Sequence, residues 1–135
     1  MVQNILKLVV KATKNGQCIA VRYRGQKEIR VLEPHAVYTN DRGEVTVDGF
    51  QTRGYSASGR PPPFWRPFRV KKITAISVLN EKFLPRESEG FSSSKLRYKN
   101  GLMAIVDVSR PSHMYSPEAL QNMGPFLPKN KITGF

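Results

Sequence analysis

The sequence predicts a mainly β domain with an N-terminal α-helix, five short strands curled into a small, strongly bent barrel, and a C-terminal extension. Three observations predict this class. Apolar residues first recur at helical spacing, the period then changes to two, and tight turns with interspersed glycines separate the short strands. We expect the helix and barrel to occupy residues 1–83 and the extension residues 84–135.

The predicted helix covers residues 2–14. Its apolar side chains recur at helical spacing, at Ile5, Leu8, Val9 and Ala12. Lysines fall on the opposite side, at Lys7, Lys11 and Lys14. Asn15-Gly16 then provides a stop signal. The helix could lie on a membrane surface, but its short apolar face favours packing on a sheet.

From Gln17 onward, alternation predicts β-strands. The first covers residues 17–23, and the second covers residues 28–32, is interrupted by Pro34 and resumes over residues 36–38. Residues 40–43, Asn-Asp-Arg-Gly, are a strong turn signal before a third strand at residues 44–51.

The third strand alternates regularly and contains one glycine. Val45 and Val47 are expected to point inward. The polar residues are expected to point outward, namely Glu44, Thr46 and Asp48. Gly49 suggests a bulge or bend that lets the strand curl.

A loop rich in Gly, Ser and Pro follows, over residues 54–63, and should project as a flap. Its three prolines could instead bind a polyproline-recognising domain, but an isolated triplet is a weak signal. The fourth strand ends at Lys71-Lys72, and Pro67 places it at a sheet edge or bulge because proline lacks an N–H donor. Residues 73–79 supply the fifth strand.

The stretch from Arg60 to Ile73 contains the chain's only Trp, two Phe and five cations. In a β-strand, alternate side chains point to opposite faces. One face would carry Trp65, Pro67, Arg69 and Lys71, and the other Arg66, Phe68, Val70 and Lys72. Guanidinium groups bind phosphates in a fork, and aromatic rings stack on bases. The stretch therefore suits an anionic or stacked ligand. The alternative is that Trp65 and Phe68 belong to the core and the cations are solvated.

Beyond Phe83 the composition changes. Residues 84–95 are polar and Ser-rich, residues 101–108 predict one further strand, and residues 116–121 predict a short helix with Ser116 as N-cap. The extension could add a strand to its own sheet or pair with another copy, so a homo-oligomer is possible.

The charge balance limits the classes of partner. The 135-residue chain has 22 Lys and Arg against 10 Asp and Glu, a net charge of +12. This excess favours nucleic acid, anionic lipid or another polyanion. The lone Cys18 fits a reducing compartment, and no run approaches the roughly 20 apolar residues that a membrane helix needs, so we expect a cytoplasmic protein.

Catalytic signals are sparse. His35 and His113 are the only histidines, and neither belongs to a metal-ligand or Cys/His arrangement. Asp41 and Asp48 fit turn and surface roles. We therefore expect no enzyme, no cofactor and no metal site.

Residues from about Leu6 to Phe83 resemble a WYL domain, the small Sm/SH3-like barrel of bacterial transcription regulators and some CRISPR and helicase accessory proteins. Three stretches in order carry the resemblance: Ile19-Ala-Val-Arg-Tyr23, Arg30-Val-Leu-Glu-Pro34 and Trp65-Arg-Pro-Phe-Arg-Val-Lys-Lys-Ile73. The sequence departs from the family in two places. Residues 45–47, Val-Thr-Val, replace the Trp-Tyr-Leu triplet, and Lys72 replaces a closing arginine and so loses the guanidinium fork.

The resemblance implies a bacterial or phage protein that binds a regulatory ligand, often nucleic acid or a nucleotide, in a basic groove. By position, that groove would involve Tyr23, Arg30, Gln51, Arg69 and Lys72. Family regulators usually place a helix-turn-helix domain before this module. About fifteen residues precede the first strand here, so we do not expect a conventional repressor.

Together the residues predict a non-catalytic module that binds single-stranded nucleic acid or a nucleotide-like anion. The candidate binding residues are Tyr23, Arg30, Gln51, Trp65, Arg66, Arg69, Lys71 and Lys72. Two alternatives remain: a sensor of a small anionic metabolite, and an assembly subunit with a protein partner. Salt dependence separates nucleic acid from a small anion, because several phosphate contacts make affinity fall steeply with salt.

Overall fold

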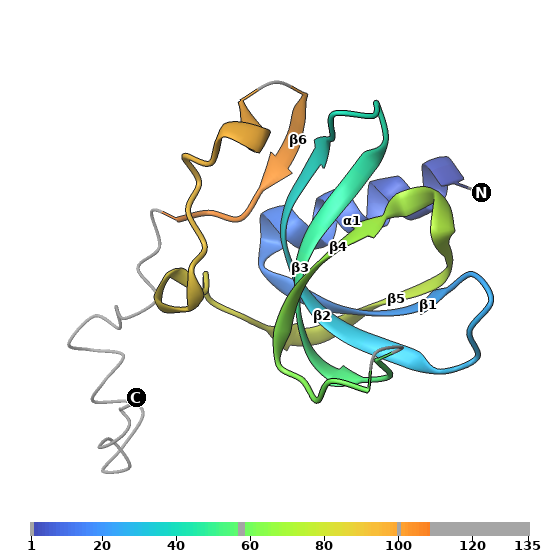
Figure 1. Cartoon of the computed structure of the whole chain (residues 1–135). Helices are drawn as coiled ribbons and strands as arrows, with labels where there is room; N and C mark the ends of the chain where they lie inside the picture. Colours follow the sequence, from blue (N-terminus) through green and yellow to red (C-terminus); the bar gives the residue numbers. More distant parts are fainter. Residues whose placement is uncertain (1, 57–58, 100, 109–135) are drawn as a thin grey trace, which may run out of the picture.

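The computed structural model of the chain describes residues 2–56, 59–99 and 101–108. The fold is mainly β, with one N-terminal helix followed by an antiparallel sheet (Figure 1). The elements, in chain order, are α1 (Val2–Asn15), β1 (Gln17–Tyr23), β2 (Ile29–Thr39), β3 (Val45–Gly54), β4 (Phe64–Arg69), η1 (Val70–Lys72), β5 (Ile73–Lys82), η2 (Glu87–Glu89), η3 (Leu96–Tyr98) and β6 (Leu102–Ile105). The predicted class is therefore confirmed.

Helix α1 ends where the sequence predicts. Gly16 has a φ of +66°, a left-handed conformation that glycine adopts without strain. Val9 and Ala12 are fully buried against the sheet, as expected, but Leu8 stays 39% exposed and Thr13 is buried in its place. The Thr13 hydroxyl donates to the Val9 carbonyl at 2.8 Å, which satisfies its polar group inside the core.

The strands are ordered β4-β3-β2-β1-β5, and β6 pairs with β2 beside this path. Strand β4, which contains Pro67, lies at one end of the path, as the missing N–H predicts. In the described part of the chain, β4 and β5 are the two ends of the sheet and are not paired with each other. The sheet is strongly curved (Figure 1) but is not closed into the predicted barrel, because no hydrogen-bonded ladder joins its two end strands in the described residues.

The pairing of β2 with β3 is irregular around His35. Pro34 faces Gly49, Ala36 faces Asp48, and His35 between them has no partner on β3. This bulge replaces the predicted interruption, so β2 runs unbroken through Pro34. A Cβ atom on Gly49 would lie 2.6 Å from the end of the Leu32 side chain, so a larger residue there would force Leu32 to shift.

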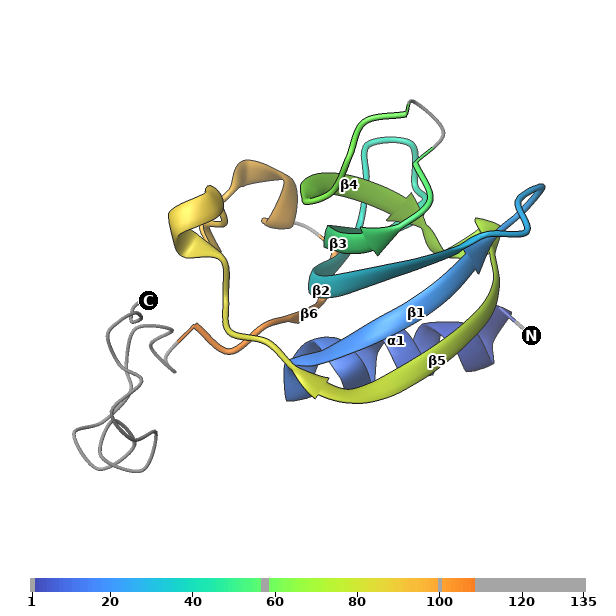
Figure 2. The same cartoon turned by 90° about the horizontal axis from the view of Figure 1, so that it is seen from below.

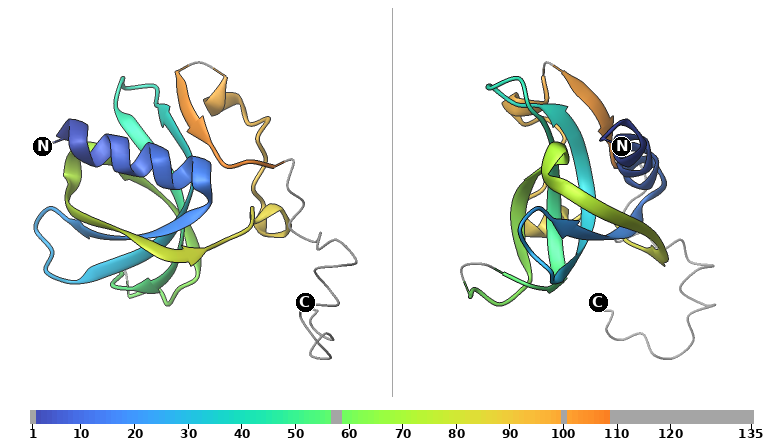
Figure 3. Two further views of the ribbon diagram at one scale, coloured as in Figure 1. Left: turned by 180° about the vertical axis from the view of Figure 1, so that it is seen from behind. Right: turned by 90° about the vertical axis from the view of Figure 1, so that its right-hand side faces the viewer.

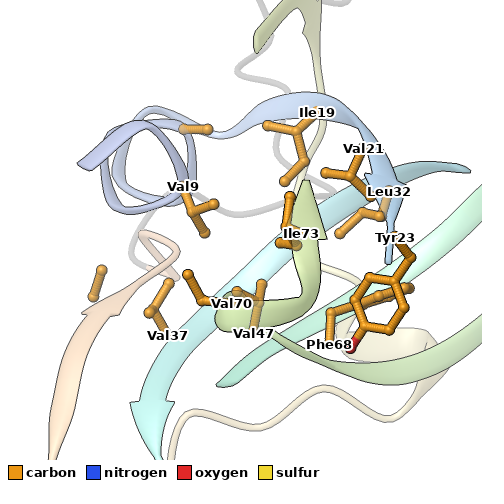
Figure 4. Packing of buried hydrophobic residues seen from close by; sticks show 12 residues of the cluster. Val9, Ile19, Val21, Tyr23, Leu32, Val37, Val47, Phe68, Val70 and Ile73 are labelled. Atoms are coloured by element: carbon orange, nitrogen blue, oxygen red, sulfur yellow. The ribbon is translucent and has the colours of Figure 1, made fainter. Parts of the chain in front are cut away.

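The main core fills the concave side of the sheet. Figure 4 shows Val9 of α1 directed toward Val70 and Ile73, with Tyr23 and Phe68 at the far end of the cluster. Seen from behind in Figure 3, α1 lies across the strands. In Figure 2, α1 and the loop between β3 and β4 lie on opposite sides of the sheet. Helix α1 therefore covers one end of the main core, and Tyr23 and Phe68 lie at the other end.

The extension lies against the outer face of the same sheet. A second cluster, which we call the outer cluster, joins the sheet to residues 83–108 and consists of Ala36, Tyr38, Trp65, Phe83, Phe91, Tyr98, Ile105, Val106 and Val108. Strand β6 lies within the segment predicted to be a strand and pairs with residues 36–38 of β2. The short helix predicted at residues 116–121, and His113, lie outside the described residues.

Gly54 at the end of β3 allows a test of the close approach between β3 and the start of β2. Gly54 has a φ of +103°, and a Cβ there would lie 2.2 Å from the Ile29 carbonyl oxygen. Gly43 has a φ of +78° with open space around it. Both alanine variants incur the left-handed cost of about 1–2 kcal/mol. We expect Gly54→Ala to lose a further ~1–3 kcal/mol from overpacking in urea unfolding, and equal losses in the two variants would contradict the close approach.

Candidate ligand-binding site

Arg30 on β2 is fully buried, with 0% of its surface exposed. Two side-chain amides hold its guanidinium group. Nη1 donates to Gln51 Oε1 at 3.2 Å and Nη2 donates to Gln26 Oε1 at 3.0 Å. Gln51 is itself fixed, because its Nε2 donates to the Tyr55 carbonyl at 2.8 Å. Strands β2 and β3 and the turn after β1 therefore orient this group together.

Aromatic rings surround the same guanidinium group. The Arg30 Cζ atom lies 5.8 Å from the centre of the Tyr23 ring, 5.5 Å from that of Tyr55 and 5.6 Å from that of Phe68. Tyr23 and Phe68 also belong to the main core, so Arg30 closes the end of the interior that α1 does not reach. Ring faces attract cations, which offsets part of the cost of removing the charge from water.

Arg66 on β4 brings a second guanidinium group to the same ring. Its Cζ atom lies 5.7 Å from the centre of Phe68. The Nε atoms of Arg30 and Arg66 are both buried and have no hydrogen-bond partner. Burial, and then the charge of Arg66, lowers the pKa of Arg30. We call the cluster formed by Arg30, Arg66, Tyr23, Tyr55 and Gln51 the arginine pocket, a name for these packed side chains and not for an open cavity.

The arginine pocket lacks a counter-charge. Neither Arg30 nor Arg66 forms an ion pair with a carboxylate of residues 2–56, 59–99 or 101–108. Buried charges in proteins are normally paired, and a buried N–H donor without an acceptor is costly. Arg30 and Arg66 are therefore two neighbouring cations, each with one buried donor that no described residue accepts from.

Arg69 and Lys71 lie outside this pocket, because both bind Glu44. Arg69 Nη1 lies 3.3 Å and Lys71 Nζ 2.9 Å from Glu44 Oε2. The hydrogen bond from Lys71, with smaller contributions from Asn40 and Arg69, lowers the pKa of Glu44 to about 2. These two cations thus share one carboxylate within the protein. Only the backbone of Arg69 reaches the pocket, where its N–H donates to the Tyr23 hydroxyl at 2.7 Å.

Trp65 lies on the opposite face of β4 and belongs to the outer cluster. Its Nε1 donates to the Glu89 carbonyl at 2.7 Å, and its ring is 4.8 Å from His35 and 5.0 Å from Phe50. Trp65 is therefore packed among other side chains, as the alternative interpretation of this stretch as core predicts. Lys72 is half-buried in η1, where its carbonyl accepts from the Arg24 N–H. Of the eight predicted binding residues, the structure brings together Tyr23, Arg30, Gln51 and Arg66.

Two residues that contact the Arg30 guanidinium group have little signal in the sequence. Tyr55 follows β3 at the start of the flap, and Gln26 lies in the turn between β1 and β2. An aromatic residue within a Gly- and Ser-rich loop was the available signal for Tyr55. Nothing local distinguishes Gln26 from an ordinary turn residue.

Asp48 is not the surface residue that alternation predicts, because the extension covers its face of the sheet. It is 5% exposed and accepts hydrogen bonds from the Tyr38 and Tyr98 hydroxyls and from Arg97. Burial first, and then the Asp48 carboxylate, raises the pKa of both tyrosines. This network joins β2, β3 and η3.

His35 occupies the bulge of β2 beneath the extension. Its Nε2 accepts from the Arg86 N–H at 3.0 Å, so Nδ1 carries the proton and donates to the Glu33 carbonyl at 2.9 Å. Arg86 also binds the Glu33 carboxylate with two nitrogens, at 2.8 and 2.9 Å. Burial lowers the pKa of His35 to about 4. The neutral imidazole is thus a structural link between sheet and extension.

None of the helices in the described ranges is long and apolar enough to cross a membrane. Across those ranges, no three His, Cys, Asp or Glu side chains gather in a way that could hold a metal ion.

Comparison with known proteins gives one weak likeness. No family model and no curated protein matches the chain. A solved structure, proteasome accessory factor B/C (PafBC) of Arthrobacter aurescens, is similar over 66% of this chain and 13% of that one, with 24% identity and a TM-score of 0.48. The chain thus spans about an eighth of that protein. A likeness at this level identifies neither a family nor a function.

The buried imidazole makes stability depend on pH. Its folded pKa of about 4 lies below the ordinary 6.5, so the unfolded chain binds the proton more readily. Stability is therefore complete above pH 6.5 and falls as pH decreases toward 4, by on the order of 3 kcal/mol. Urea unfolding at several pH values should show this loss, and His35→Asn should reduce it. An identical pH profile for both proteins would contradict the assignment.

Proposed function

We propose that this chain is a WYL-type ligand-binding module without catalytic activity, and that it binds a phosphate-bearing, nucleotide-type ligand. The ligand would be a free nucleotide or part of a single-stranded nucleic acid. One observation carries the proposal: Arg30 and Arg66 flank the Phe68 ring, lack carboxylate partners among the described residues and have unused Nε–H donors.

The chemistry of the arginine pocket supports a phosphate. Guanidinium groups donate two parallel hydrogen bonds to phosphate oxygens, and such charge-assisted bonds are among the stronger ones in proteins. Tyr55 offers a ring face beside the cations, on which a base can stack. A pocket with two cations and a ring matches one nucleotide unit better than a long phosphate track, since Arg69 and Lys71 are occupied by Glu44.

Access to Arg30 requires a local movement. Arg30 is fully covered, whereas Arg66 is partly exposed. The covering groups include Tyr55 and Gln26, which lie outside the strands, at the start of the flap and in the β1–β2 turn. In the proposal, an anion first meets Arg66 and then replaces Gln26 as the acceptor for Arg30. The binding energy of the phosphate would offset this rearrangement.

The sequence resemblance to WYL domains is consistent with this assignment. Three of the five groove positions that it implies, Tyr23, Arg30 and Gln51, lie in the arginine pocket. Arg66, which the resemblance does not place in the groove, replaces Arg69 as the second cation in our proposal. In a regulatory role, ligand binding would be read out through the flap and the β1–β2 turn.

Arg66→Ala provides the first test of the pocket. We expect this variant to bind a fluorescein-labelled single-stranded oligonucleotide about tenfold more weakly in anisotropy titrations, because a charge-assisted hydrogen bond contributes ~1.5–3 kcal/mol. Arg42→Ala, in the turn at the other end of the β2–β3 hairpin, is the matched control and should bind like the parent protein. Equal weakening in both variants would indicate nonspecific charge attraction and contradict the pocket.

Arg30→Lys tests whether binding needs the two parallel hydrogen bonds of a guanidinium group or only a positive charge. Lysine keeps the positive charge but cannot donate in a bidentate manner. We expect weaker binding of the same oligonucleotide and a lower melting temperature, because lysine cannot replace the forked hydrogen bonds to Gln26 and Gln51. Parent-like affinity in a folded Arg30→Lys variant would exclude Arg30 from binding.

Titrations with a mononucleotide and with an oligonucleotide distinguish a free nucleotide from a nucleic acid strand as the source of the phosphate. A mononucleotide should compete with the oligonucleotide, with an affinity that changes little between two ionic strengths, if one phosphate is bound. If a nucleic acid strand is the ligand, its affinity should fall steeply with salt concentration. Arg66→Ala should then reduce the slope of log affinity against log salt concentration by about 1. Absence of binding in both arms would contradict the proposed function.

A further inference from the structure

Residues of α1 and Met103 of β6 line a groove. Figure 2 shows α1 on the opposite side of the sheet from the loop between β3 and β4. Its volume is about 420 Å³, and its lining residues are Leu6, Lys7, Val10, Lys11, Lys14, Asn15 and Met103. A volume of this order is typical of a ligand or partner site. The groove contains none of the residues of the arginine pocket.

The floor of the groove is apolar. Leu6 and Val10 are partly buried where they border the main core. Met103 on β6 is 42% exposed, and its flexible thioether side chain adapts to varied apolar surfaces. An open apolar strip of this kind loses contact with water only when another molecule covers it.

Three lysines form a row along the groove. Lys7, Lys11 and Lys14 are spaced i, i+4 and i+7, which places them on one side of α1 over about 10 Å. None of the three forms an ion pair with a carboxylate of the described residues, and α1 contains no acidic residue. The groove therefore combines an apolar floor with unneutralised positive charge along its wall.

We propose that this groove binds an acidic amphipathic helix of a partner protein. Such a helix presents apolar side chains at i, i+3, i+4 and i+7, which would lie on Leu6, Val10 and Met103. Carboxylates beside that stripe, repeated at the same helical spacing, would face the three lysines. One partner helix would then contact both the row of lysines and the apolar floor of the groove.

Other occupants fit this surface less well. A nucleic acid backbone would use the lysines but leave the apolar floor uncovered, and a small anion needs one cation rather than a row. Residues 109–135 of the same chain have the wrong charge, since Arg110, Lys129 and Lys131 outnumber the single Glu118. An anionic membrane meets the charge requirement, but a groove suits a helix better than a planar surface.

The test uses the full chain and a labelled 18-residue peptide with Leu at i, i+3, i+4 and i+7 and Glu along one flank. We expect saturable binding by anisotropy and at least tenfold weaker binding of a scrambled peptide of identical composition. Lys7→Glu/Lys11→Glu should weaken binding at least tenfold, and Met103→Glu at least threefold. Lys27→Glu/Arg42→Glu, which makes the same change of charge away from the groove, should have little effect.

Several outcomes would overturn the proposal. These are equal binding of the scrambled peptide, equal losses in the two double variants, and binding to phosphatidylglycerol vesicles that the peptide does not compete away. Loss of oligonucleotide binding in Lys7→Glu/Lys11→Glu, with peptide binding intact, would reassign the lysines to nucleic acid. Arg66→Ala should leave peptide binding unchanged, so failure of one proposal is distinguishable from failure of the other.

Discussion

The curl of β2 against β3 is the constraint on which the rest of the structure depends. A sheet bent this strongly encloses an interior that must be filled, and in this chain its outer face is also apolar and is covered by residues 83–108. Strand β2 bulges at His35, and Gly49 opposite Pro34 leaves room for the Leu32 side chain. Helix α1 then fills one end of the interior with aliphatic side chains, and Arg30 closes the other end.

The distribution of buried carboxylates explains why the arginine pocket stays cationic. Glu33 and Asp48 are buried, but both serve the outer face, where Arg86 and Arg97 bind them. Glu44 holds Arg69 and Lys71 near the turn after β2. Because every one of these acids has cations of its own, Arg30 relies on amide oxygens and ring faces, which leave its net charge uncompensated.

Periodicity was sufficient to predict the helix, the five strands of the curved sheet and the edge position of β4, because each depends on local spacing or on a single proline. It could not show which face of a strand another segment would cover. Trp65 and Asp48 were therefore assigned to solvent or ligand, although the polar, Ser-rich segment after Phe83 folds back over them. The pairing of Arg69 with Glu44 likewise joins residues 25 positions apart, beyond the reach of any local pattern.

The outer-face network also determines where the chain can be cut. A fragment ending near Phe83 would lack Arg86 and Arg97, which bind Glu33 and Asp48, and would lack Phe91 and Tyr98 of the outer cluster. The remaining apolar side chains of that cluster would then face water, which lowers the net stability of a small domain. Expression boundaries drawn at the end of β5 would therefore divide the outer cluster.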